Sequence, residues 1–468
     1  MKCVDRRIVL ELVAGLSCLS LAGCVSDEMG LQQETMGSGP EQWDNQATWG
    51  NLDLAWSALL LREPGVDTSA DEEPLSEMAL GIIIRTSNLA TWGQNVLVGA
   101  GGALLMFDTA IGDVLDRFEL SAQDTNSPMG DVAAVAVDGD TAYLATSGGY
   151  FVSIDLASKK QLWAQLVCPA RQTGWLAQDV DGTYEDLPGA WLCPNVVVHD
   201  GALVTGFSSY QMENASTLVC VEAATGAVRW TRQLEGRLDT AGGLGYPVAV
   251  EAGILLPMPD GSGLGLLSWQ AGETLDLLQT GSEIYMGLTM SEGGALPCYF
   301  QSKLGTLYRV EVEKGSLVAS SAQDACTDAT KRVPSGARPL LVGDRVLVNA
   351  ATQDEDAPRF EGDYDPSRGE CVTFDARTLE VLERHDAPEI ESTPVLVGDD
   401  AYYLGRAGIY RASVADGVLG EPELVFDEEG RDRDVWDQQL LAADDMLYFV
   451  GGPYGERRLF AVGQVGGA

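Results

Sequence analysis

Hydrophobic and polar residues alternate in short runs along much of the chain. In STLVCVEAATGAVRW, residues 216–230, two such runs flank an acidic residue, Glu222, and a Thr-Gly pair. Alternation with a period of two predicts β-strands with one buried face. An acidic side chain can accept hydrogen bonds from the backbone amides that follow it, and glycine adopts the positive φ that closes a turn. The stretch therefore predicts two antiparallel strands joined by a tight turn.

The same pattern recurs at a nearly regular interval. An apolar run ends near an acidic or hydroxyl residue, and a glycine usually follows four residues later. Successive copies lie 38 to 67 residues apart, and a repeat of about 40 to 50 residues built from short strands is typical of a β-propeller. The eight copies are anchored at Asp108, Asp155, Glu222, Ser268, Glu311, Asp375, Ser413 and Val462.

A second pair of strands precedes most of the copies. VAAVAVDGDTAYLAT lies before Asp155 and NVVVHDGALVTGF before Glu222, each with an Asp-Gly dipeptide at its centre. Such dipeptides between alternating runs are hairpin signals, so each unit predicts four antiparallel strands. We expect an all-β fold, an eight-bladed β-propeller of four-stranded antiparallel blades over residues 78–466. A seven-bladed ring is the alternative.

The last unit offers no outer strand after Val462. The segment MALGIIIRTS, residues 78–87, is strand-like and has no partner in its own neighbourhood. We expect this N-terminal strand to close the ring, because closure leaves no exposed sheet edge. The preceding residues, 49–77, are expected to form an N-terminal cap and an acidic loop, with a short helix or cap over Trp49–Leu61.

The N-terminus has the features of an export signal. Residues 1–23 combine a basic start with an apolar run that ends in small residues, as secretory signals do. Leu21-Ala22-Gly23-Cys24 resembles the lipobox of bacterial lipoproteins, in which cleavage leaves the cysteine first and acyl chains are attached to it. Residues 24–48, rich in Ser, Gln, Glu and Gly, are expected to be a flexible tether. Val25 and Ser26, by resemblance to lipoprotein sorting, imply the outer membrane.

Charge narrows the choice of partners. The chain has 70 Asp and Glu residues against 29 Lys and Arg, a net charge of -41. Such a surface repels the phosphates of nucleic acids and the headgroups of anionic lipids. Contact with the membrane is therefore expected through the lipid anchor only, and the ring is expected to be monomeric with no nucleic acid bound.

Six cysteines remain once those of the signal and the lipidation site, Cys24, are set aside. In an oxidising compartment an even number suggests disulfides, although six cysteines allow fifteen connectivities. Proximity in the sequence favours Cys168 with Cys193 and Cys298 with Cys326. The other two are expected to be unpaired buried thiols on strands, Cys220 and Cys371.

At two of the turns the sequence follows the pattern x-D-x-x-T-G-x-x-x-W, with Trp163 and Trp230 at its end. It resembles the repeat of pyrroloquinoline-quinone-type (PQQ-like) eight-bladed propellers, in which the tryptophan packs between blades. Asp116 and Leu382 stand near the tryptophan position in other copies, and Lys159 stands where one glycine would be. Within this family, the lipoprotein subunit of outer-membrane β-barrel assembly shares the lipidated eight-bladed architecture that we expect here.

No catalytic, cofactor or metal site is assigned from the sequence. The family's dehydrogenases resemble one another in a vicinal cysteine pair above the quinone, and this chain has no adjacent cysteines. His199 and His385 each flank an aspartate and are expected to be inert, and Gly261–Gly265 does not fit the G-x-G-x-x-G spacing. Three acidic runs contain part of a calcium-loop pattern, but solvated insertions are favoured: Asp179–Asp186, Asp354–Asp365 and Asp427–Asp434.

Two insertions, residues 167–193 and 351–370, are longer than a blade turn requires. Long loops on one rim of a propeller form binding surfaces. Trp175, Tyr184 and Trp191 are of the type enriched in interfaces, or else they cover their own disulfide. We expect a non-enzymatic, lipid-anchored platform for envelope or outer-membrane proteins, with outer-membrane protein assembly as its candidate role. The alternatives are a propeller that binds a small molecule, glycan or calcium, and a quinone-dependent dehydrogenase.

Overall fold

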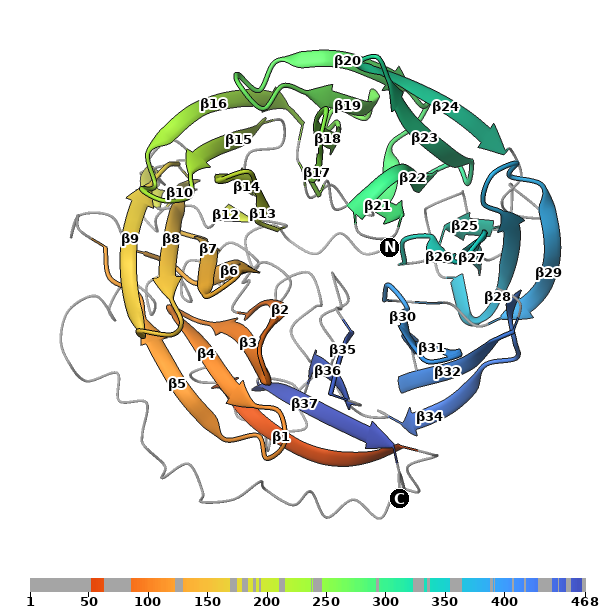
Figure 1. Cartoon of the computed structure of the whole chain (residues 1–468), viewed down its shortest axis with the longest axis horizontal. Helices are drawn as coiled ribbons and strands as arrows, with labels where there is room; N and C mark the ends of the chain where they lie inside the picture. The colour runs from red at the N-terminus through yellow and green to blue at the C-terminus, as the bar shows by residue number, and fades with distance from the viewer. Residues whose placement is uncertain are drawn as a thin grey trace.

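The protein is an eight-bladed ring of antiparallel strands around a central axis (Figure 1). No α-helix occurs in the part of the chain that the structure describes, and so no helix there could cross a membrane. The eight blades confirm the fold predicted from the repeat. The computed structural model is described for residues 52–62, 86–122, 129–168, 175–178, 184–187, 191–192, 195–209, 215–236, 238, 246–291, 294–322, 332–334, 337–353, 364–387, 390, 392–405, 408–415, 418–427, 440–444, 446–451 and 456–464.

The strands of each blade follow one another from the axis outward. Blade 1 contains β2 (Thr86–Trp92), β3 (Asn95–Ala100), β4 (Ala103–Asp108) and β5 (Val114–Glu119). Blade 2 contains β6 (Val132–Asp138), β7 (Thr141–Thr146), β8 (Tyr150–Asp155) and β9 (Lys160–Leu166). Blade 3 contains β13 (Val197–His199), β14 (Ala202–Ser209), β15 (Ala215–Glu222) and β16 (Val228–Glu235), with β12 (Trp191–Leu192) as an additional strand. Blade 4 contains β17 (Val248–Val250), β18 (Gly253–Pro257), β19 (Gly263–Leu267) and β20 (Thr274–Gln279).

The second half of the ring repeats this order. Blade 5 contains β21 (Ile284–Ser291), β22 (Ala295–Ser302), β23 (Leu307–Glu313) and β24 (Ser316–Ala322). Blade 6 contains β26 (Leu340–Val342), β27 (Arg345–Gln353), β28 (Tyr364–Asp375) and β29 (Val381–Ala387), with β25 (Arg332–Pro334) as an additional strand. Blade 7 contains β30 (Val395–Val397), β31 (Asp400–Gly405), β32 (Gly408–Ala415) and a divided outer strand, β33 (Val418–Leu419) and β34 (Glu423–Asp427). Blade 8 contains β35 (Leu441–Ala443), β36 (Met446–Gly451), β37 (Glu456–Gln464) and β1 (Leu52–Arg62).

An N-terminal strand closes the ring, but it is a different segment from the one expected. β1 pairs antiparallel with β37 from Leu52 opposite Gln464 to Arg62 opposite Glu456. The helix or cap expected over residues 49–61 is therefore wrong, and so is the closing role of residues 78–87. Of that segment, Thr86 and Ser87 belong to β2, the innermost strand of blade 1, and the rest lies outside the described residues.

Bulges in β1 explain why its sequence suggests a helix. Leu52, Trp56 and Leu60 are buried at a spacing of four residues, which is closer to the helical period than to the period of two of a strand. Register shifts between Leu54 and Trp56 and between Leu59 and Leu61 change the phase of the strand. Such bulges insert an extra residue, so a helix-like pattern fits one face of a sheet. Pairing with the open edge of β37 then outweighs local propensity.

The turn chemistry predicted from the repeat is present in the regular blades. In blade 6 the Asp375 carboxylate accepts hydrogen bonds from the backbone N–H of Arg377 (3.0 Å) and of Thr378 (2.7 Å). These bonds, led by the one from Thr378, lower the pKa of Asp375. Lys159 and Leu379, without glycine's freedom, adopt φ of +58° and +60° at the position of the turn glycine. Three anchors differ from the prediction because they lie inside strands: Glu311 in β23, Ser413 in β32 and Val462 in β37.

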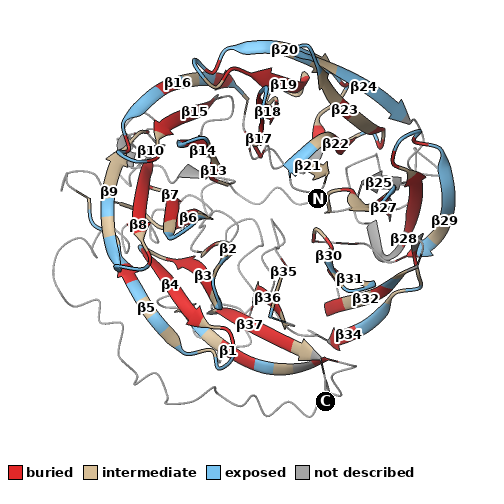
Figure 2. Ribbon diagram, in the orientation of Figure 1, coloured by how far each residue is buried: buried red, intermediate tan, exposed pale blue. Residues whose placement is uncertain are grey.

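The hydrophobic core lies between the blades. One cluster joins Trp56 and Tyr448 of blade 8 to Val96 and Phe107 of blade 1. Figure 2 shows buried residues along the middle strands and exposed residues along outer strands such as β20 and β29. The apolar face of each predicted strand therefore packs against the next blade, as the period of two requires.

Three tryptophans on outer strands bind the turn of the following blade in the same way. The indole N–H of Trp163 donates to the carbonyl oxygen of Ala223 at 3.1 Å. A Cβ on Gly226, in that same turn, would lie 2.7 Å from the Trp163 ring, so glycine is needed for close packing. Trp230 bonds to Trp269 O at 2.9 Å, and Trp56 of β1 bonds to Thr109 O at 3.0 Å.

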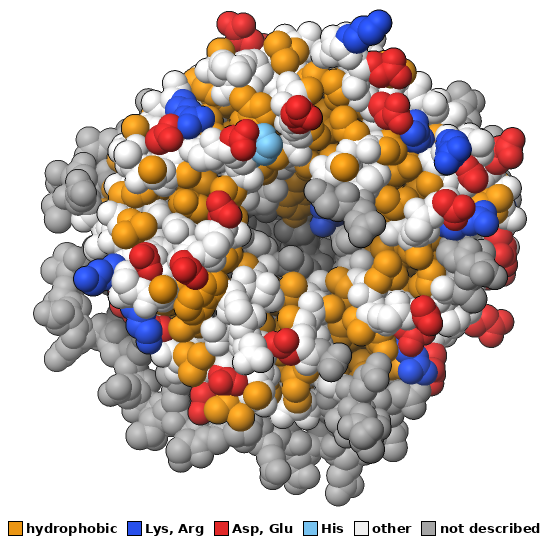
Figure 3. Space-filling view, in the orientation of Figure 1, with side chains coloured by type: hydrophobic (Ala, Val, Ile, Leu, Met, Phe, Trp, Pro, Cys, Tyr) orange, Lys and Arg blue, Asp and Glu red, His pale blue; other side chains and the backbone are white. Residues whose placement is uncertain are grey.

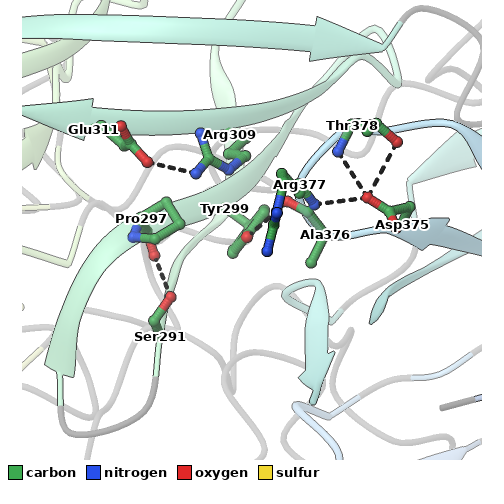
Figure 4. A network of polar contacts seen from close by, with 9 residues as sticks. All are labelled: Ser291, Pro297, Tyr299, Arg309, Glu311, Asp375, Ala376, Arg377 and Thr378. Atoms are coloured by element: carbon green, nitrogen blue, oxygen red, sulfur yellow. Dashed lines mark hydrogen bonds and ion pairs between the residues drawn. The ribbon is translucent and has the colours of Figure 1, made fainter. Parts of the chain in front are cut away.

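Other seams replace the tryptophan by different side chains. Asp116, at the tryptophan position of blade 1, pairs with Lys159 of blade 2 at 2.5 Å. Between blades 4 and 5, Asp276 accepts a hydrogen bond of 2.7 Å from the backbone N–H of Leu317. Between blades 5 and 6, the Tyr299 hydroxyl donates to the carbonyl oxygen of Ala376 at 2.8 Å (Figure 4). Ala376 directly follows an anchor residue, as Thr109, Ala223 and Trp269 do.

Removing the Tyr299 hydroxyl is expected to destabilise the ring. Tyr299→Phe leaves the buried carbonyl of Ala376 without this donor, at a cost of about 1–3 kcal/mol in the free energy of unfolding. Tyr308→Phe is the control, because the Tyr308 hydroxyl also bonds to a carbonyl, that of Thr280, but is only partly buried. Denaturant unfolding of both variants should show the larger loss for Tyr299→Phe. Equal losses would contradict the role given to Tyr299.

Candidate interaction surface on the loop rim

The two rims of the ring differ because the strands of each blade alternate in direction. The turns between first and second and between third and fourth strands lie on one rim, the turn rim; residues 93–94 and 109–113 form two of them in blade 1. The links between second and third strands and between successive blades lie on the other rim, the loop rim. Residues 167–196 and 354–363 are two such links. Both insertions singled out in the sequence therefore begin and end on the loop rim.

The first insertion carries a small hairpin between blades 2 and 3. β10 (Trp175–Gln178) pairs antiparallel with β11 (Tyr184–Leu187), with the backbone of Trp175 opposite Leu187 and that of Tyr184 opposite Gln178. β12 then pairs with the loop-rim end of β14, with Trp191 opposite Ser209. The topology thus places the backbones of all three predicted aromatic anchors in the insertion. Their side chains lie outside the described residues, so a binding role for them stays a prediction.

The second insertion extends blade 6. Its strands β27 and β28 remain paired as far as Gln353 opposite Tyr364, and β25 adds to β27 with Pro334 opposite Ala350. Blades 3 and 6 therefore each have a fifth strand at the loop rim. Sequence reasoning missed both additional strands, because two or three residues are too few to show alternation.

An ion pair between a buried glutamate and a partly exposed arginine lies at the base of the blade 6 insertion. Glu370, with a relative exposure of 6%, accepts a hydrogen bond of 3.1 Å from Arg384. Beside it, the Asn349 carboxamide donates to the carbonyl of Glu370 at 3.4 Å and accepts from the backbone N–H of Ile390 at 3.0 Å. Removing the Arg384 guanidinium takes a counter-charge from the buried Glu370 carboxylate and is therefore destabilising. The insertion is therefore held where it joins β27 and β28, whose pairing register is fixed.

The inner strands, which line the axis, contain few charged residues. β2, β6, β13, β17, β21, β26, β30 and β35 contain one Asp, Glu, Lys or Arg residue, Asp138 at the end of β6. Arg338, just before β26, donates from Nε to Thr393 Oγ1 at 3.1 Å and from Nη1 to Leu288 O at 3.4 Å, and lies 5.6 Å from the centroid of the Tyr246 ring. It therefore links blades 4 to 7. Figure 3 shows one face of the ring, hollowed at its centre and bordered by hydrophobic side chains.

The structure describes the candidate histidine sites but not the side chains of the candidate acidic runs. Among the described residues, no group of three or more His, Cys, Asp and Glu side chains is placed to hold a metal ion. The side chains of the three acidic runs, Asp179–Asp186, Asp354–Asp365 and Asp427–Asp434, lie outside the described residues. His199 stacks on Trp269 with ring centroids 4.7 Å apart. Gly261 and Ser262 belong to the turn into β19, whereas Gly263–Gly265 are that strand's first residues, so the blade turn expected over Gly261–Gly265 is confirmed only in its first two residues.

The described cysteines are buried and weakly acidic. Cys220 on β15 and Cys371 on β28 are free thiols, as predicted, and burial raises their pKa to about 11 and about 12. Thiolate chemistry is therefore suppressed at both. Burial also raises the pKa of the Cys168 thiol to about 11 and that of the Cys298 thiol to about 12. Their predicted partners, Cys193 and Cys326, lie outside the described residues, so both disulfides stay predictions.

Known proteins share this architecture. The family described as outer membrane protein assembly factor BamB matches residues 68–182 and 193–418. BamB from Moraxella catarrhalis is 14% identical with a TM-score of 0.51, over 87% of this chain and 99% of that one. A europium-containing methanol dehydrogenase is 13% identical with a TM-score of 0.52, over 91% of this chain and 95% of that one. Sqt1 from Saccharomyces cerevisiae is 10% identical with a TM-score of 0.54, over 89% of this chain and 100% of that one.

These likenesses differ in what they establish. The family match covers more than half of the chain, whereas structural likeness at such low identity shows the fold alone. A methanol dehydrogenase and the assembly factor BamB occur together among the similar structures. No protein of the curated collection matches the sequence. The comparisons therefore show the family and the fold, and the function depends on the residues at the rims and along the axis of this ring.

Proposed function

The chain belongs to the family of outer membrane protein assembly factor BamB, and from that premise we propose that it is a non-enzymatic, lipid-anchored interaction platform of the bacterial envelope. Its finer role is to bind outer-membrane proteins or their assembly partners. The observation that carries the proposal is the gathering of the long insertions of blades 3 and 6 on one rim, with a fifth strand at the base of each. Rigid scaffolds present binding loops in this manner.

The axis supports a binding role over quinone chemistry. In the dehydrogenases that this fold resembles, a cysteine pair, a catalytic aspartate and calcium-binding acids surround the quinone, and this chain has no adjacent cysteines. The described inner strands are almost free of acidic residues. Incubation with pyrroloquinoline quinone and calcium, followed by alcohols and a redox dye, is expected to give no dye reduction. Turnover that depends on both additions would reverse the assignment.

The position of β1 suits a tethered ring. Twenty-seven residues separate the proposed lipid site, Cys24, from the start of β1 at Leu52. A flexible segment of this length has an r.m.s. span of about 30 Å. Leu52 lies opposite Gln464, at the turn-rim end of blade 8. The tether therefore leaves from the turn rim, and the loop rim faces away from its attachment point.

Site-specific crosslinking in intact cells tests the proposal. A photoreactive residue at Leu304, in the loop-rim turn between β22 and β23, is expected to capture outer-membrane or assembly proteins, and so is one at Trp175. The matched control is Ile111, on the turn rim, because Leu304 and Ile111 are similarly exposed, at 49% and 53%. Equal capture from both rims, or capture from Ile111 alone, would contradict a partner surface on the loop rim.

Loss of the protein tests the finer role. Deleting the gene is expected to lower the amount of folded β-barrel protein in the outer membrane, measured by heat-modifiable mobility in gels. The wild-type chain should restore it, whereas Cys24→Ser should restore it poorly because the ring is no longer held at the membrane. Unchanged barrel levels in the deletion strain would remove the assembly role and leave a platform with another partner.

A further inference from the structure

The seam between blades 6 and 7 differs from the seams that a tryptophan closes. In blade 6 the position of the tryptophan, eight residues after the anchor Asp375, is taken by Glu383, whose side chain is exposed. Thr373, directly opposite Glu383 on β28, is fully buried. In blade 2 the corresponding pair is Ser153 and Trp163. The outer part of the seam between blades 6 and 7 therefore lacks the large aromatic side chain that fills the seam after blade 2.

Three buried polar atoms without hydrogen-bond partners belong to residues on this seam. They are Thr373 Oγ1, His385 Nε2 and Tyr403 Oη. His385 lies opposite Cys371 in the β28–β29 pairing, and Thr373 lies two residues from Cys371, on the same face of the sheet. Tyr403, from blade 7, packs in one apolar cluster with Cys371. Cys371 is thus the common neighbour of the three groups.

Leaving these atoms unpaired would be costly. The great majority of buried polar atoms in folded proteins have a hydrogen-bond partner. A water molecule in a protein interior typically bonds to two to four polar groups that are otherwise unsatisfied. Each hydroxyl can donate or accept, and a neutral imidazole nitrogen can do either, depending on its tautomer. One guest that both donates and accepts can therefore satisfy all three atoms.

The composition of the seam favours a neutral guest. The buried residues packed around Cys371 and Tyr403 are Leu347, Ala387, Ile390, Ala401, Ala412 and Leu419. None of them is charged, and three are alanines. Glu370, the nearest buried acid along β28, adjoins Cys371 and so points to the opposite face of the sheet, where it pairs with Arg384. Glu383, opposite Thr373 on the same face, is exposed. An ion would therefore have no buried counter-charge among the residues packed here, whereas a water molecule needs none.

We propose that the seam between blades 6 and 7 holds an internal water site formed by Thr373 Oγ1, His385 Nε2 and Tyr403 Oη. The bound water bridges β28 and β29 of blade 6 to β31 of blade 7. The inference is independent of the proposed function, because it rests on the packing of two blades rather than on the loop rim.

Two isosteric substitutions test the site by the sign of their effect. If water bridges the hydroxyls, Tyr403→Phe and Thr373→Val each remove one of its bonds, and each should shift the unfolding equilibrium several-fold towards the unfolded state. If the atoms are dry and unpaired, the same substitutions remove a buried unsatisfied group and raise stability. Tyr299→Phe is the matched control, because the Tyr299 hydroxyl has a protein partner. A rise in the denaturation midpoint of Tyr403→Phe or Thr373→Val would overturn the proposal.

A double-mutant cycle and a crystal structure complete the test. The combined variant Tyr403→Phe/Thr373→Val is expected to lose less stability than the two single losses added together, because both hydroxyls bind one water. Strict additivity would overturn the shared site. A crystal structure of the unmodified chain at high resolution should show solvent density within hydrogen-bond distance of Thr373 and Tyr403. A direct bond between these side chains, with no solvent, would overturn the proposal even if the variants fail to fold.

Discussion

A chain lacking β1 is expected to lose most of its stability or to remain unfolded. Residues 52–62 supply three buried apolar side chains among those described, Leu52, Trp56 and Leu60, and the whole outer edge of blade 8. Complete burial of a large apolar side chain contributes about 1.5–3 kcal/mol, so the three together approach the total stability of about 5–15 kcal/mol of a typical folded protein. The hydrogen bond from Trp56 to Thr109, which joins blade 8 to blade 1, is lost as well.

Circular dichroism on heating and size-exclusion chromatography measure this effect. A chain beginning at residue 63 should melt far below the mature protein or associate through the open edge of β37. A chain beginning at residue 49 is the control and should melt like the mature protein, because it keeps β1. Adding a synthetic peptide of residues 49–63 to the shorter chain should restore part of the stability. If the chain from residue 63 melts at the same temperature as the control, β1 does not close the ring.

Gly226→Ala is expected to destabilise the ring far more than a glycine substitution in an open turn. A Cβ at Gly226 would lie 2.7 Å from the Trp163 ring, in a backbone with φ of +73°. An alanine at this positive φ lowers the free energy of unfolding by about 1–2 kcal/mol. Displacing the Trp163 ring from its contact with the turn lowers it by about a further 1–3 kcal/mol. Gly139, with φ of +57° and no atom within 4 Å of such a Cβ, is subject to the first effect alone.

Denaturant unfolding of Gly226→Ala and Gly139→Ala separates the two contributions. The difference between their losses in free energy of unfolding measures the fit of Trp163 against the turn of blade 3. In a Trp163→Ala background the loss from Gly226→Ala should shrink towards that from Gly139→Ala, because the contact no longer exists. Equal losses for the two glycines in the wild-type background would show that Trp163 does not depend on a glycine opposite it.

Much of the fold could be predicted because its unit is local. The Asp375 turn is specified by residues next to one another, and the alternation before it specifies the strands. Closure could not be predicted in the same way, because the helix-like spacing of Leu52, Trp56 and Leu60 is resolved only by bulges against β37, a strand four hundred residues away. Sequence reasoning therefore found that an N-terminal strand closes the ring but chose the wrong segment.

The contacts between neighbouring blades were also hard to predict from the sequence. Asp116 at a tryptophan position and Lys159 at a glycine position look like two separate departures from the repeat, yet they form one ion pair between blades 1 and 2. Tyr299 reaches the next turn from the second strand of its blade, where no motif would place it. The candidate surface was predictable in part: the length of the insertions indicated it, and the strand order placed them on one rim.

The direction of β1 also governs how the ring bears mechanical load. If the chain is held by lipid at Cys24, tension enters at Leu52 and pulls β1 along its own length, past the antiparallel β37. Hydrogen bonds of a strand pulled lengthwise share the force, whereas a strand peeled from its free end would break them one at a time. If the lipid anchors the chain at this end of β1, the β1–β37 pairing that closes the ring therefore resists force exerted through a bound partner.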